Sequence, residues 1–173
     1  MDAVEQSSQI EESKPQGFAT WKTIKLGTQK TVEDLSQALR DDDFRIGANA
    51  AQILKDIQLA ENETEIELVL LTVRDLGFKE SARRDDIYER AGDLGFDLVP
   101  GEVGPQLRLQ YTNQRMDEWM ALAMRPIAGS AGDPRVFYVG RNDGGRWLHG
   151  RYGYPDSMWG SYDHWVFARS KQN

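Results

Sequence analysis

Apolar and polar residues alternate with two different periods along the chain, and the period predicts which stretches form strands and which form helices. Residues 21–26 read WKTIKL, in which Ile24 and Leu26 alternate with polar residues, so we expect a short strand that ends at Gly27. The stretch ETEIELVLLT at 63–72 alternates in the same way and predicts a second strand with at least one buried face.

Apolar spacings of three and four residues predict three helices in the first half of the chain. Thr31 is the expected N-cap of the first helix, because Asp34 follows three positions later, and the acidic run at 41–43 marks its end. The stretch 46–60 repeats the helical pattern. A third helix is expected from Arg83 to Leu94, with Gly95 as its C-terminal cap.

Beyond Pro100 no helical period is found, and short segments rich in aromatic and aliphatic residues predict strands. These segments are LRLQY, WMALAMRPI, RVFYVGR, RWLHGRY and HWVFARS. The run NDGG at 142–145 is the clearest hairpin signal. The sequence therefore predicts an α+β fold in which a helical N-terminal half packs on a C-terminal antiparallel β-sheet. We expect one such domain over 18–173, after a disordered acidic tail at 1–17.

Composition and charge exclude several classes of function. Hydrophobic residues make up 39% and charged residues 28% of the 173 positions, which is typical of a globular protein, and no residue is a cysteine. Disulfides, zinc–thiolate centres, iron–sulfur clusters and thiol nucleophiles are therefore excluded. The net charge of −7 makes nucleic acid an unlikely partner.

Nothing in the sequence predicts a membrane segment or a cofactor. The longest apolar runs are far shorter than the roughly 20 residues of a spanning helix, and the first residues show no secretory signal pattern. We therefore expect a cytoplasmic protein that does not bind membrane.

Four stretches of the chain resemble a family of small uncharacterised bacterial proteins. They are TWKTIKLGT at 20–28, LGFKESARRDDIYERAGDLG at 76–95, VGPQLRLQY at 103–111 and WVFAR at 165–169. The resemblance extends over nearly all of 18–169. The family has no established activity, so the resemblance implies membership and assigns no catalytic residue.

The candidate ligand site lies in the C-terminal stretch 142–170, which holds three of the five tryptophans and both histidines. Loops lie at the surface and often carry function, which favours the segment 153–163 between two predicted strands. Trp159 has two interpretations: a plug that folds this loop onto the core, which we favour, or part of a binding face. Trp147 and Trp165 are expected to be core residues on paired strands. The weak ligand-binding candidates are Arg108, Arg151, Tyr154, Asp156, Trp159 and Tyr162.

Arg108 is a candidate because of its place in the predicted strand LRLQY. Alternation would put Gln106, Arg108 and Gln110 on one face and the leucines on the other. If the polar face met the aromatic loop, Arg108 and the rings together would suit a planar or anionic ligand. The opposite assignment of the faces stays open.

Two functional hypotheses follow from these residues. The leading one is a non-enzymatic interaction module whose aromatic-rich C-terminal sheet and loop bind a protein or a small planar or anionic ligand. It is favoured because the chain has neither a phosphate-binding P-loop motif nor a G-x-S-x-G nucleophile elbow. The alternative is a hydrolase-like enzyme of unfamiliar type in which Asp156, His149 or His164 supply the acid and base. The spacing of these residues matches no metal-binding loop, so no metal site is expected.

Overall fold

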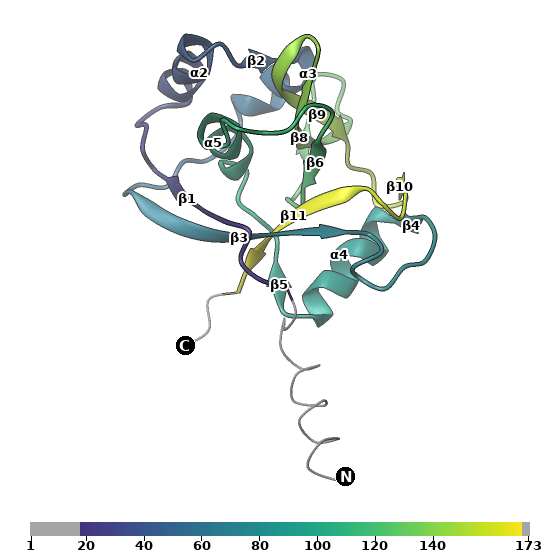
Figure 1. Ribbon diagram of the computed structural model, residues 1–173. Helices are drawn as coiled ribbons and strands as arrows, with labels where there is room; N and C mark the ends of the chain where they lie inside the picture. The colour runs from purple at the N-terminus through teal and green to yellow at the C-terminus, as the bar shows by residue number, and fades with distance from the viewer. Residues whose placement is uncertain (1–17, 171–173) are drawn as a thin grey trace.

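The computed structural model describes residues 18–170, and its centre is a curled mixed sheet of nine strands (Figure 1). The predicted tail at 1–17 lies outside the described residues. The order across the sheet is β1 (Lys22–Leu26), β3 (Thr64–Thr72), β11 (His164–Arg169), β6 (Trp119–Leu122), β8 (Pro134–Asn142), β9 (Gly145–Tyr152) and β2 (Arg45–Ile46). β5 (Phe96–Asp97) pairs with β11, and β7 (Ile127–Ala128) pairs with β8. β4 (Ala82–Arg83) and β10 (Met158–Trp159) form a separate two-stranded sheet.

The helices within residues 18–170 are α2 (Val32–Asp41), α3 (Ala48–Leu54), α4 (Arg84–Asp93) and α5 (Val103–Gln110). The N-cap prediction for α2 is confirmed, because Thr31 Oγ1 accepts a hydrogen bond from the backbone N–H of Asp34 at 3.0 Å. The predicted helix from Arg83 to Leu94 is confirmed as α4, and Gly95 follows it with a φ of 91°. The NDGG hairpin is also confirmed, since β8 and β9 pair out to Asn142 and Gly145.

The predicted division into a helical N-terminal half and a C-terminal antiparallel sheet is wrong. β1 and β3 come from the first half of the chain and yet belong to the same sheet as β11, β6, β8 and β9 (Figure 1). β3 is apolar on both faces, with Leu68 and Val69 at 0% and 1% exposure, and such a strand belongs inside a sheet that is covered on both faces. The sheet is also not purely antiparallel, because β11 with β6 and β2 with β9 are parallel pairs.

The segment VGPQLRLQ, for which the alternating leucines predicted a strand, forms helix α5 instead. Val103 and Leu107 are four positions apart and both fully buried, so they share one face of the helix. Pro105 lies in the first turn, where its missing N–H leaves no hydrogen bond unmade. At Gly104 an added Cβ would lie 2.4 Å from a Phe137 ring atom, so the helix and β8 are in direct contact. Tertiary packing decides the conformation of this segment.

The two faces of the sheet are covered differently. α2, α3 and α5 pack on one face over a cluster that includes Leu35, Leu107 and Leu148. On the other face, α4 packs over β3 and β11, where Trp165 and Phe167 are fully buried. That same face continues across β6, β8 and β9, away from α4 (Figure 1). We call this part of the face the open half, because its aromatic side chains are only partly buried.

Candidate functional site

Four aromatic rings stack in a row on the open half of the sheet. We call this row the aromatic column, and its members in order are Trp147, His149, Trp119 and Tyr138. Successive ring centroids lie 4.7, 5.5 and 5.1 Å apart, and successive ring planes are inclined by 7°, 26° and 15°. This geometry is a nearly parallel stack. All four side chains keep partial contact with solvent.

Strand register brings the rings of the column together. Tyr138 of β8 lies directly opposite His149 of β9, and Gly140 lies opposite Trp147 on one side and Trp119 on the other. An added Cβ at Gly140 would lie 1.9 Å from a ring atom of Trp119, so the Trp119 ring packs directly against this glycine. A glycine inside a strand is the usual sign of such a close approach.

The sequence pattern did not identify Trp119 and Tyr138 as candidate site residues. Both lie in segments predicted as strands, but pairing of those strands with β9 cannot be inferred from local alternation. The available signal was Gly140, an isolated glycine within the strand RVFYVGR.

Two arginines close the ends of the aromatic column. The guanidinium of Arg45 lies 5.7 Å from the Trp147 ring, and that of Arg151 lies 4.8 Å from the Tyr138 ring. Each ring of the column therefore packs against at least one other ring, and all four rings keep partial contact with solvent.

Trp159 lies in the core, which supports the interpretation of this residue as a plug. Its side chain is 3% exposed, and its ring centroid is 4.4 Å from that of Trp165. The chain around it is fixed to the start of α4, because the carbonyl of Ser157 accepts the backbone N–H of Arg84 at 2.8 Å. The carbonyl of Pro155 accepts the next N–H of α4 at 2.9 Å. The loop therefore supplies the hydrogen bonds that an N-cap side chain would otherwise provide.

The other residues predicted for the loop lie apart from the column. Tyr154 and Tyr162 are 41% and 73% exposed, and Asp156 is exposed as well. The Tyr154 ring packs against Tyr152 at 5.6 Å. Of the six predicted residues, only Arg151 and Trp159 adjoin the aromatic column.

Arg108 lies inside the protein, where its guanidinium joins α5 to the hairpin of β8 and β9. It is fully buried and donates to the side-chain oxygen of Gln114 at 2.6 Å and to the carbonyl of Tyr111 at 2.8 Å. It also donates to the carbonyls of Gly140 and Trp147 at 3.0 and 3.3 Å. Burial lowers the pKa of Arg108 to about 10. Arg108 therefore supports the strands beneath the column and cannot meet a ligand at the surface.

The structure does not bring the two histidines together. His149 and His164 lie on β9 and β11, which β6 and β8 separate, and the same separation shows that the expected pairing of the Trp147 and Trp165 strands is wrong. Burial lowers the pKa of His149, whose ring is held between two indoles. Within residues 18–170, no group of three or more His, Asp and Glu side chains is placed to hold a metal ion.

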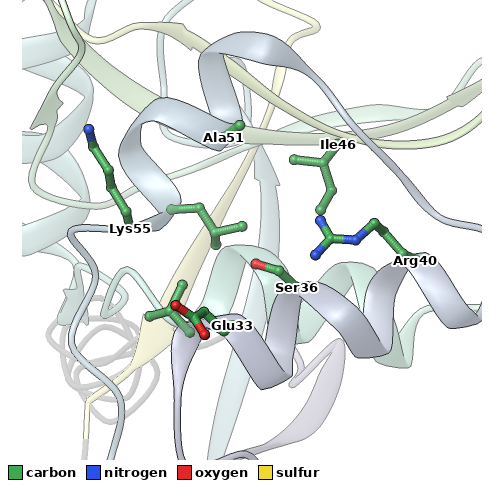
Figure 2. Close-up of a pocket in the computed structure, with 8 residues that line it drawn as sticks. Glu33, Ser36, Arg40, Ile46, Ala51 and Lys55 are labelled. Carbon is green, nitrogen blue, oxygen red and sulfur yellow. The ribbon is translucent and has the colours of Figure 1, made fainter.

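A hollow between α2 and α3 is a second place where a ligand could bind (Figure 2). Its volume is about 440 Å³, and Ile46 and Ala51 form part of its apolar lining. Glu33, Arg40 and Lys55 border it, so charges of both signs are present. It has no aromatic residue in its lining, which distinguishes it from the aromatic column.

Comparison with models of protein families, with curated proteins and with solved structures gives no match for this chain. The resemblance to a family of small bacterial proteins therefore stays a prediction. None of the helices in the described part of the chain is both long enough and apolar enough to cross a membrane.

Proposed function

We propose that this protein is a non-enzymatic, cytoplasmic binding module whose recognition surface is the open half of the sheet. The observation that carries the proposal is the aromatic column, in which four rings stack on one another on one sheet face and all stay partly exposed. Exposed, rigid aromatic side chains on a sheet supply contact area at low cost in conformational entropy.

Rigidity is the second support for this function. Pairing of β8 with β9 extends over the whole hairpin, from Arg135 with Tyr152 to Asn142 with Gly145. Arg108 holds the carbonyls of Gly140 and Trp147 from the opposite face. A surface held from both sides changes little on binding, which limits the entropy lost when a ligand docks.

The geometry also indicates how a ligand would lie. The rings of the column stack on one another, and all four stay partly exposed. The ligand is expected to place its apolar atoms against the exposed parts of the Trp119 and Trp147 indoles.

The proposal is tested by backbone amide NMR of the full chain with four small probes: indole, benzyl alcohol, benzoate and phenyl phosphate. We expect the largest shift changes in β6, β8 and β9. Trp147→Ala should weaken binding severalfold, whereas the control Trp21→Ala, at the partly buried Trp21 near β1, should leave it unchanged. Shift changes that gather at the hollow between α2 and α3, or none at all, would contradict the proposal.

The same samples separate the binding module from a hydrolase. A binding module returns phenyl phosphate intact, so its ³¹P signal should stay constant over a day. Release of inorganic phosphate that disappears on changing His149 or His164 would favour the enzyme and overturn the proposal.

A further inference from the structure

Arg151 is held between two aromatic rings at one end of the column. Its guanidinium carbon lies 4.8 Å from the ring centroid of Tyr138 and 4.7 Å from that of Trp159. Tyr138 comes from β8 and Trp159 from β10, so the two rings belong to different parts of the fold. Arg151 itself is exposed. Two rings therefore restrict this side chain while its end stays open to solvent.

The charge of Arg151 is not neutralised by an ion pair within residues 18–170. The ion pairs found in that range join Lys25 with Glu63, Arg84 with Asp85, and Arg135 with Asp133. Asp163 is the acid close enough to affect the pKa of Tyr138, which burial raises. One oxygen of Asp163 already accepts the backbone N–H of Gly160 at 2.7 Å.

The hairpin around Arg151 is basic although the protein is acidic. Residues 133–152 contain four arginines and two acids, Asp133 and Asp143, and Asp133 is paired with Arg135, against a net charge of −7 for the whole chain. An anion that approaches the molecule is repelled by most of its surface and attracted by this hairpin. Three rings of the column, Tyr138, Trp147 and His149, lie on the same hairpin.

We propose that Arg151 is an oxyanion-binding residue, and that the ligand of the open half is an apolar or aromatic molecule carrying a carboxylate or a phosphate. This inference rests on the function proposed above and adds the chemical class of the ligand. The guanidinium donates parallel N–H groups to two oxygens of the anion, while the apolar body lies along the column. Because the two rings already restrict the side chain, less rotamer entropy is lost on binding.

The test compares charged probes with a neutral one of the same shape. Titration calorimetry of the full chain is run with benzoate, phenyl phosphate and neutral benzamide. We expect the preferred anion to bind about tenfold more tightly than benzamide, as a charge-assisted hydrogen bond predicts. A preference for benzoate assigns a carboxylate ligand, and a preference for phenyl phosphate assigns a phosphate ligand.

Variants show whether Arg151 is the residue responsible. Arg151→Gln should remove the preference for the anion, and Arg151→Lys should keep only part of it, because an ammonium lacks the planar fork. The matched control is Arg146→Gln, which removes the same charge from the same strand and should change the affinity less than about twofold. If Arg151→Gln does not fold, the test uses Arg151→Lys instead. It also uses the NMR signal of the Arg151 side-chain N–H in the unchanged protein, measured with and without the anion.

Each result has one meaning. Equal binding of benzoate, phenyl phosphate and benzamide, all at β6, β8 and β9, would overturn the inference and leave the binding module standing. If Arg146→Gln removes the preference for anions as fully as Arg151→Gln does, the preference is a diffuse charge effect. That result would also overturn the inference. If none of the probes binds to the open half, the proposed function itself is contradicted.

Discussion

Aromatic residues gather in two places on the same side of the nine-stranded sheet, and the protein uses them in opposite ways. Under α4, Trp165 of β11 and Trp159 of the neighbouring β10 pack edge to face at 4.4 Å and are 3% exposed or less. On the open half, Trp147 and His149 stack nearly parallel at a similar 4.7 Å and stay partly exposed. The ring spacing is alike in the two places, whereas the ring orientation and the cover differ.

The cover on the closed side comes from α4, which lies far from β11 in the sequence. α4 places Ile87 and Tyr88 over β11, and the loop before β11 is hydrogen-bonded to the first turn of α4. On the open side the rings stack on one another, and Arg45 and Arg151 lie against Trp147 and Tyr138. These rings stay partly exposed, which leaves them accessible to a ligand.

Trp159→Ala should give the largest effect of the changes that test this comparison. Truncation of a fully buried large aromatic side chain to alanine typically lowers the free energy of unfolding by about 3–5 kcal/mol. Trp147→Ala, on the open half, should cost only about 1–2 kcal/mol, because the ring is partly exposed to water in the folded protein. Urea denaturation of the two variants measures the difference. Equal losses would mean that the two halves of the face are not distinct.

Local features of the fold could be predicted from the sequence, whereas the partners of each segment could not. Thr31 caps its helix and NDGG turns its hairpin because those preferences depend on a few neighbouring residues. The strand prediction for VGPQLRLQ was wrong because its leucines alternate as they would in a strand. The helix depends on the contact of Gly104 with Phe137, which joins residues distant in the sequence and cannot be inferred from local alternation. The aromatic column needs the order β6, β8, β9, in which Trp119 lies opposite Gly140, 21 positions along the chain.

The candidate site shows the same limit. The concentration of aromatic residues at 142–170 directed attention to a stretch that holds two rings of the column, Trp147 and His149, and Arg151 was among the candidates chosen there. Trp119 lies outside that region, and the strand order alone brings it beside His149. Arg108 was chosen on a strand interpretation that the helix α5 overturns.

Gly140→Ala should disturb the open half and leave the closed half intact. An added Cβ would lie 1.9 Å from the Trp119 ring, so the ring must move and the stack with His149 and Tyr138 must open. Overpacking of this kind costs about 1–3 kcal/mol. Near-ultraviolet circular dichroism should show the change in the stack, and urea denaturation should show the loss of stability.

The control for Gly140→Ala is Gly92→Ala in α4. An added Cβ at Gly92 has no atom within 4 Å, so the change should be neutral or raise stability by about 0.5–1 kcal/mol through the helix propensity of alanine. If Gly140→Ala were as harmless as Gly92→Ala, the rings of the column would not be packed against β8.

The smallest expected effect is a pH dependence that His149 confers on the open half. Burial lowers the pKa of His149 in the folded protein, so the unfolded chain, with a histidine pKa of about 6.5, binds the proton more readily. The contribution of the neutral imidazole is therefore complete above about pH 7 and is lost as the pH falls through 6.5 and below. Relative to His149→Phe, which cannot titrate, the unchanged protein should lose stability between pH 7 and pH 5. A gain in that range would mean that attraction between the imidazolium and the rings of Trp147 and Trp119 exceeds the cost of burial.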